Sequence, residues 1–197
     1  MTKISAKDIA ALRAKTDLPM MEVKQALVEV GGDEKKAIEV LKKKGLKKVA
    51  KKSGRETCNG LVESYTHDGR IGVIVEVSAE TDFVAKNDQF KEFVHNLALH
   101  VAASNPKYLS ESDIPKAELD KEKKGFAAEA EKEGKPAEIA KKIAEGKMKK
   151  YFEEVCLLNQ PFIKDDKKTI SDLLTELVAK IGENIKIARF VRFELGD

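Results

Sequence analysis

The chain has 197 residues, of which 36% are charged, yet its basic and acidic side chains nearly cancel to a formal charge of +3 at pH 7. This balance argues against a protein that binds nucleic acid mainly by neutralising phosphates, although it leaves room for a local basic patch. Cys58 and Cys156 form no CxxC pair, so neither a disulfide framework nor a zinc site is indicated. No apolar run reaches the ~18 residues of a membrane span and no secretory signal is evident, so we expect a cytoplasmic protein.

The first 45 residues predict three short helices. Ser5 followed by Asp8 resembles a capping box at the start of the first helix. Asp33 is placed to cap the third helix, and Gly45 to close it. About forty residues in three helices make a marginal core, so this module is expected to depend on further contacts for part of its purpose.

The adjacent pair Met20-Met21 opens the second of these helices. Neighbouring positions on a helix point about 100° apart, so both side chains cannot face one small core. One interpretation is that one methionine packs inside and the other is an ordinary exposed residue. The other is that a flexible thioether lies on a surface that contacts a partner.

A basic run follows the third helix, and two interpretations of it are open. It comprises Lys42, Lys43, Lys44, Lys47, Lys48, Lys51, Lys52 and Arg55. Such a run is most often a solvated linker or helix face, and less often an RNA contact. No aromatic residue stands among the lysines to stack on bases, which disfavours binding to single-stranded RNA. We interpret residues 46–57 as a basic linker.

The next segment predicts a hairpin. Apolar and polar residues alternate around Leu61 and again over 71–77, and Asp68-Gly69 between them is typical of a two-residue hairpin turn. His67 stands beside this turn.

The segment 80–87 connects the second strand to a long helix whose apolar face begins at Phe90. Asn87 or Asp88 is placed to cap that helix. Phe83 has two interpretations: a helix that starts at Thr81 would bury it on the same face as Phe90, whereas a corner would leave it exposed.

The rest of the chain adds helices and one strand. Residues 116–133 predict a helix with few apolar positions, and 139–155 restore an apolar face. Apolar residues recur at helical spacing over 170–181, and Gly182 ends this predicted helix. Apolar and polar residues then alternate over 185–195, which predicts a last strand. These elements predict an α+β fold, in which a three-helix bundle precedes a small antiparallel sheet with packed helices. A sheet of about three strands leaves a face or edges uncovered, which pairing with a second copy would bury.

Catalytic signatures are missing from the sequence. Gly146-Lys147 lacks the flanking residues of a phosphate-binding loop, and no GxSxG or HExxH occurs. His95 and His100 project about 140° apart on one helix, which is poor geometry for a shared metal. We therefore expect neither catalysis, nor a cofactor, nor a metal, but a protein that binds and remodels a partner.

Several short strings resemble the translation elongation factor Ts family, in its short bacterial-type form. The resemblance runs in order over essentially the whole chain. The strings are Leu12-Arg13, Met20-Met21, Thr-Asp-Phe-Val-Ala-Lys at 81–86, His-Val-Ala-Ala-Ser-Asn-Pro at 100–106, Gly-Lys-Pro-x-x-Ile-Ala at 134–140, Gln-Pro-Phe at 160–162, Lys-Ile-Gly-Glu-Asn-Ile at 180–185 and Arg-Phe-Glu at 192–194.

This resemblance implies a guanine-nucleotide exchange factor that binds elongation factor Tu and promotes release of its GDP. The bundle would be UBA-like, and Asp82 and Phe83 would intrude beside the nucleotide of Tu and disturb its magnesium. The other contacts with Tu would come from Thr81, Val84, Arg13, Met20, Met21, His67, Ile181 and Gly182.

The chain departs from longer family members, which repeat the core half and add a helical hairpin near the C-terminus; here we expect one core copy and no such hairpin. With one core copy, we expect a homodimer, with residues 1–45 as the bundle, 46–57 as the linker and 58–197 as the dimerisation core. The last strand contains no cysteine, so no disulfide is expected across the dimer. We expect no direct contact with nucleic acid; the alternatives are an RNA- or ribosome-binding protein that uses residues 42–55, and a three-helix adaptor.

Overall fold

The computed structural model describes residues 4–16, 18–132 and 137–197. It confirms the α+β class, with three helices followed by small antiparallel sheets and packed helices. The chain forms two compact units. The first comprises Met1–Leu61, Val77–Glu92 and Asp172–Lys186, and the second comprises Val62–Glu76, Phe93–Ser171 and Ile187–Asp197. The expected boundaries after residues 45 and 57 stay a prediction.

Three helices open the first unit: α1 (Ala6–Thr16), α2 (Met20–Glu29) and α3 (Glu34–Lys52). The predicted capping box is present, because Ser5 donates its amide to Asp8 Oδ2 at 3.1 Å and Asp8 donates its amide to Ser5 Oγ at 3.2 Å. Asp33 caps α3 by accepting the amide of Lys36 at 3.1 Å. The helices share a small buried core of Leu12, Val23, Ala26, Leu27, Ala37 and Leu41.

The expectation that Gly45 closes the third helix was wrong, because α3 continues through it to Lys52. A Cβ atom at position 45 would lie 3.3 Å from Thr175 Cγ2 and 3.8 Å from Ala179 Cβ, both on α8 (Ile170–Ile181). The glycine is therefore explained by the close approach of a neighbouring helix. Part of the expected linker, residues 46–52, is helical.

The larger sheet has the strand order β1-β2-β5, formed by β1 (Asn59–His67), β2 (Ile71–Ala79) and β5 (Ile185–Glu194). The predicted hairpin is confirmed: Asp68 and Gly69 have φ of 49° and 65°, and Arg70 donates its amide to the His67 carbonyl at 2.9 Å. Two successive left-handed residues give the primed turn that matches the twist of paired strands.

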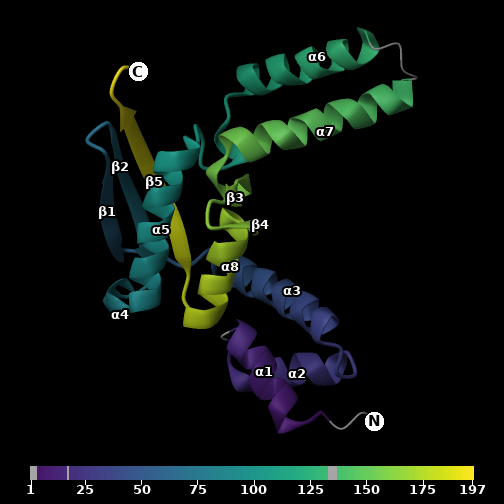
Figure 1. The fold of residues 1–197 in the computed structure, drawn as a ribbon, viewed down its shortest axis with the longest axis vertical. Coiled ribbons are helices and arrows are strands. Elements are labelled where there is room, and N and C mark those ends of the chain that lie inside the picture. The colour runs from purple at the N-terminus through teal and green to yellow at the C-terminus, as the bar shows by residue number, and fades with distance from the viewer. Residues whose placement is uncertain (1–3, 17, 133–136) are drawn as a thin grey trace. The chain divides into compact units, whose positions relative to one another are not determined.

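The helix α5 (Asp88–Ser104) runs beside the sheet (Figure 1). In the second unit, Val73 and Val75 of β2 and Val94 and Leu97 of α5 are all buried. Ile74 of β2 is 46% exposed. Since side chains alternate along a strand, the face of the sheet opposite to α5 is left open.

Two long helices of the second unit, α6 (Lys116–Lys132) and α7 (Ala137–Val155), form an antiparallel hairpin (Figure 1). Glu118 accepts hydrogen bonds from the hydroxyls of Tyr108 at 2.6 Å and Tyr151 at 2.8 Å. The expectation that the chain has no helical hairpin was therefore wrong, because the sequence predicted both helices but not their pairing. Gly134-Lys135-Pro136 between them lie outside the described residues. The remaining elements are η1 (Glu111–Asp113), η2 (Leu157–Asn159) and a second, two-stranded sheet of β3 (Pro161–Phe162) and β4 (Asp165–Thr169).

Candidate functional site

The corner after β2 contains its own short helix, α4 (Asp82–Lys86). Asn87 follows in an extended conformation, with φ −67° and ψ 133°, which separates α4 from α5. Its Oδ1 accepts the amides of Gln89 at 2.8 Å and Phe90 at 3.3 Å, so Asn87 is the predicted cap of α5. Because of this break, α4 is a separate short helix and is not the first turn of α5.

The two faces of α4 have opposite environments. Val84 is 6% exposed and belongs to the core, whereas Phe83 is 81% exposed. Of the two interpretations of Phe83, the exposed one is therefore correct, because the helix that would have placed it on the same face as Phe90 is interrupted at Asn87. A large aromatic ring left in water at a fixed corner is a candidate contact for a partner.

Glu183 holds the start of α4. Its carboxylate accepts the hydroxyl of Thr81 at 2.9 Å and the amide of Thr81 at 3.1 Å. Hydrogen bonds to an ionised acceptor are roughly twice as strong as neutral ones. The corner is thereby tied to the segment that follows α8.

A second set of contacts supports the same junction. The carboxylate of Glu80 accepts the amide of Asn184 at 2.6 Å and the guanidinium of Arg55 at 3.3 Å. The Asn184 amide, followed by Arg55, lowers the pKa of Glu80 and so keeps this carboxylate ionised. These contacts join three distant stretches of the first unit around the corner.

Asp82 lies on the exposed part of α4 and forms an ion pair with Lys86, one turn later, at 2.7 Å. The hydrogen bond and charge of Lys86 lower the pKa of Asp82. Its side chain is nevertheless 55% exposed. The carboxylate is therefore ionised and accessible to a partner.

Gly182 ends α8 with a φ of 86°, and its amide donates to Val178 at 2.9 Å. The ammonium of Lys52 donates to the Gly182 carbonyl. Since Glu183 holds Thr81, the structure brings Ile181 and Gly182 into one junction with the corner at 81–84.

The other expected contacts in the first unit lie on α1 and α2. Met20 and Met21 are 53% and 62% exposed, and Arg13 is exposed as well. The interpretation in which one methionine packs inside was wrong, because both occupy the first turn of α2, whose buried positions begin at Val23. They leave two flexible apolar side chains on the surface.

His67 belongs to the second unit, whereas the corner belongs to the first. Its Nδ1 lies 3.1 Å from the Tyr65 hydroxyl, and the side chain is 57% exposed. It stands at the end of β1, beside the turn, as the sequence predicted.

Sequence reasoning missed the residues that position the corner: Glu80, Glu183 and Asn184. All three are polar residues beside an element boundary, and only their long-range hydrogen bonds distinguish them. The string 180–185 was noted, but no role could be assigned to Glu183 without knowledge of its contact with Thr81.

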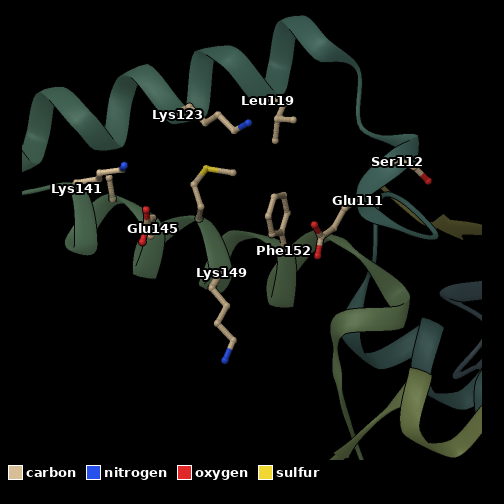
Figure 2. Close-up of a pocket in the computed structure, with 10 residues that line it drawn as sticks. Glu111, Ser112, Leu119, Lys123, Lys141, Glu145, Lys149 and Phe152 are labelled. Atoms are coloured by element: carbon tan, nitrogen blue, oxygen red, sulfur yellow. The ribbon is translucent and has the colours of Figure 1, made fainter. Parts of the chain in front are cut away.

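A groove of about 790 Å³ lies between α6 and α7, where Leu119 and Phe152 point toward each other (Figure 2). Its rim includes Lys123, Lys141 and Glu145. None of the expected site residues lines it. Within the described part of the chain, no group of three or more His, Cys, Asp or Glu side chains could hold a metal, and no helix is long and apolar enough to cross a membrane.

Comparison with known proteins decides the family. A family model described as elongation factor TS matches residues 5–197. The chain belongs to the elongation factor Ts family. It is 54% identical over 194 residues to elongation factor Ts of Alkaliphilus oremlandii, covering 98% of this chain and 90% of that protein. It is 51% identical to the Acetivibrio thermocellus and Caldanaerobacter subterraneus proteins, each over 195 residues and 98% of this chain, covering 91% and 98% of those proteins.

Elongation factor Ts is a nucleotide-exchange factor for elongation factor Tu in translation elongation and not an enzyme. The expectation of a binding protein that remodels its partner agrees with this family. A corner that presents one aromatic ring and one ionised carboxylate is compatible with binding and remodelling a partner, because these groups act through contacts and need no covalent step.

Proposed function

We propose that the protein binds elongation factor Tu in its GDP-bound form through the corner at 81–84 and accelerates GDP release by disturbing the magnesium and phosphate site. The observation that carries this proposal is the 81% exposure of Phe83 on a helix held by the buried Val84. The contacts of Thr81 with Glu183 support it, since they fix the direction in which the ring projects.

Simple energetics show that insertion of Asp82 and Phe83 beside the nucleotide of Tu, here called the wedge, is feasible. Magnesium that bridges the phosphates of GDP requires near-ideal octahedral geometry, so a small displacement of its ligands lowers nucleotide affinity. Burial of Phe83 in an apolar pocket of Tu would contribute about 1.5–3 kcal/mol toward that distortion. The ionised Asp82 would add a negative charge close to the bound phosphates, which further disfavours GDP.

The kinetic need for exchange follows from affinity. A nucleotide bound with a Kd of about 1 nM and an on-rate of about 10⁶ M⁻¹s⁻¹ leaves at only about 10⁻³ s⁻¹. Rapid protein synthesis requires faster release. Factor and nucleotide must therefore weaken each other's binding to Tu, and this coupling is reciprocal.

The remaining expected contacts would extend the interface beyond the corner. Exposed methionines adapt to the shape of a partner, which supports a role for Met20 and Met21 together with Arg13 of α1. Ile181 and Gly182 adjoin the corner through Glu183 and would contact Tu with it. His67 would contact Tu from the second unit. The role in translation implies a cytoplasmic location.

A homodimer is part of this proposal. The uncovered face of the larger sheet carries exposed apolar residues from all three strands, Val62, Ile74, Val191 and Phe193, and Leu195 follows directly after β5. Phe193 is 69% exposed and Leu195 is 71% exposed. Two such faces stacked on each other would remove this apolar surface from water, as in the packing of two sheets.

The test of exchange is the release rate of a fluorescent GDP from purified Tu, measured with the unmodified chain, with Phe83→Ala and with Ile163→Ala. Ile163 is a matched control, because it is also an exposed apolar residue but lies between β3 and β4. We expect strong acceleration that only Phe83→Ala largely removes.

If Phe83→Ala still accelerates GDP release, the wedge is refuted, and the contacts around Met20 would then have to cause the acceleration. No acceleration by the unmodified chain would refute the exchange proposal itself.

A further inference from the structure

The second half of α3 presents two chemically different sides. Three of its lysines face acceptors in the first unit: Lys44 pairs with Glu29 at 2.7 Å, Lys48 pairs with Glu22 at 2.6 Å, and the Lys52 ammonium donates to the Gly182 carbonyl. Their charges are satisfied within the unit.

The other lysines of this stretch project outward, and we call them the α3 lysine face: Lys42, Lys43, Lys47 and Lys51. All four are exposed. Among the residues that the structure describes, none of them has an acidic partner. The segment 42–51 contains no Asp or Glu, and its other outward residues are Leu46 and Ala50. The face therefore carries four uncompensated positive charges.

Helix geometry arranges these charges regularly. Lys43, Lys47 and Lys51 are four residues apart, which places them on successive turns about 6 Å apart along one side of α3. From Lys42 to Lys51 the face is about 14 Å long. In a DNA duplex the phosphates of one strand are about 3.4 Å apart along the helix axis, so a face of this length is on the scale of a few successive phosphates of a duplex strand.

We propose that the α3 lysine face binds the phosphate backbone of double-stranded RNA, as an interaction beyond nucleotide exchange. Recognition of an RNA duplex depends on shape and phosphate contacts and does not require aromatic rings that stack on bases. The sequence-based objection, the lack of aromatic residues, therefore applies only to single strands. The small net charge is no objection either, because the acids that offset these lysines lie elsewhere in the chain.

The composition of the face favours RNA over an acidic protein. Protein interfaces obtain most of their affinity from a few buried aromatic or arginine side chains. The α3 lysine face has neither, and its largest apolar side chain is Leu46, which is 57% exposed. Regular lysines on a straight helix suit a regular row of phosphates and would bind it without reading its sequence.

The experiment measures binding of the full chain to a short mixed-sequence RNA hairpin by fluorescence anisotropy over a series of salt concentrations. The unmodified protein is compared with Lys42→Gln/Lys43→Gln/Lys47→Gln/Lys51→Gln. The control changes the same charge on another helix, at Lys116, Lys121, Lys123 and Lys124 of α6, each to Gln. Glutamine keeps helix propensity close to that of lysine.

If all four lysines contact phosphates, log K falls with log salt with a slope between about −3 and −4. We expect the α3 variant to bind at least about tenfold more weakly at low salt and with a slope near zero, while the α6 control keeps both values. GDP release from Tu should be unchanged in the α3 variant, which separates this proposal from the exchange mechanism.

Absence of RNA binding by the unmodified chain, or equal losses in both variants, would overturn the proposal. So would loss of exchange in the α3 variant without any RNA binding, because the lysines would then be contacts with an acidic surface of Tu.

Discussion

Thr81 donates both its hydroxyl and its amide to the carboxylate of Glu183, which lies 102 positions further along the chain. The direction of Phe83 thus depends on a residue that does not share its helix. Glu183 is a positioning residue, whose proposed effect on exchange passes through the corner.

Replacement of Glu183 by Ala removes both acceptor contacts of Thr81 and should lower the maximal GDP release rate. Glu183→Gln keeps one side-chain oxygen as an acceptor for the hydroxyl, so its loss should be smaller. The measurement is the release rate at saturating factor, combined with a double-mutant cycle with Phe83→Ala. If Glu183 acts by orienting Phe83, Glu183→Ala should add little in the Phe83→Ala background. Fully additive losses would contradict this role.

The uncovered face of the larger sheet predicts how the dimer can be broken. Phe193→Asp places a charge within the proposed apolar interface, where desolvation without a partner is costly. Sedimentation equilibrium at micromolar concentration should show a dimer for the unmodified chain and a monomer for this variant. Ile163→Asp puts the same charge on an exposed apolar position away from the sheet and should remain dimeric. A monomeric mass for the unmodified chain would refute the homodimer.

His100 predicts a loss of stability toward acid. The ring is buried, and its Nε2 lies 2.9 Å from Gln160 Oε1. Because the Gln160 amide donates to the carbonyls of Ser104 and Glu154, its oxygen is the acceptor and Nε2 carries the proton. Nδ1 has no partner among the described residues, and burial lowers the pKa of His100. The folded protein therefore favours the neutral ring.

The sign of this effect follows from proton linkage. Below about pH 6.5 the unfolded chain binds a proton at His100, whereas the folded protein keeps this ring neutral. The free energy of unfolding therefore falls as the pH falls, until the lower pKa of His100 in the folded state is reached. The slope attributable to this group is at most about 1.4 kcal/mol per pH unit. Urea unfolding at about pH 7.5 and about pH 5.5 measures it. His100→Phe should remove this part of the dependence, while a variant of the exposed His95 to Gln should retain it.

The two cysteines should differ sharply in reactivity. Cys58 is exposed, whereas Cys156 is fully buried, and burial raises the pKa of Cys156 to about 11. The thiolate is the reactive form, so Cys156 should be inert in the folded protein. Titration with a thiol reagent near neutral pH should find one reactive thiol in the native protein and two after denaturation. Cys58→Ser should leave none in the native protein, and a reactive Cys156 would indicate local opening around α7.

Local patterns in the sequence predicted much of the fold. The capping box at Ser5, the turn at Asp68-Gly69 and the cap at Asn87 each depend on residues within a few positions, and the structure confirms all three. The end of α3 was placed wrongly at Gly45, because a glycine inside a helix gives the same signal as one that ends it. Only the approach of α8 explains why this one lies inside.

Elements that depend on distant partners could not be predicted in this way. The strands β3 and β4 were missed although they are neighbours in the sequence, because β3 has only two residues and β4, Asp-Asp-Lys-Lys-Thr, shows no apolar alternation. The pairing of α6 with α7 was missed, because α6 has few apolar positions and the apolar face of α7 does not by itself identify its partner. At the site, the exposed Phe83 could be proposed from the sequence, but Glu183 could not. Its role lies entirely in a contact across the chain.

The continuity of α3 has a consequence for how strongly a partner can be bound. A flexible linker between the first helices and the corner would lose about 1–2 kcal/mol of backbone freedom for each residue that became ordered on binding. Residues 46–52 are already ordered in the helix, and Gly45 packs against α8. Once one part of the first unit has bound Tu, the other contacts proposed for that unit would meet their targets at a high effective concentration. Flexible glycine residues inserted after Lys52 would lower that concentration without changing any contact residue.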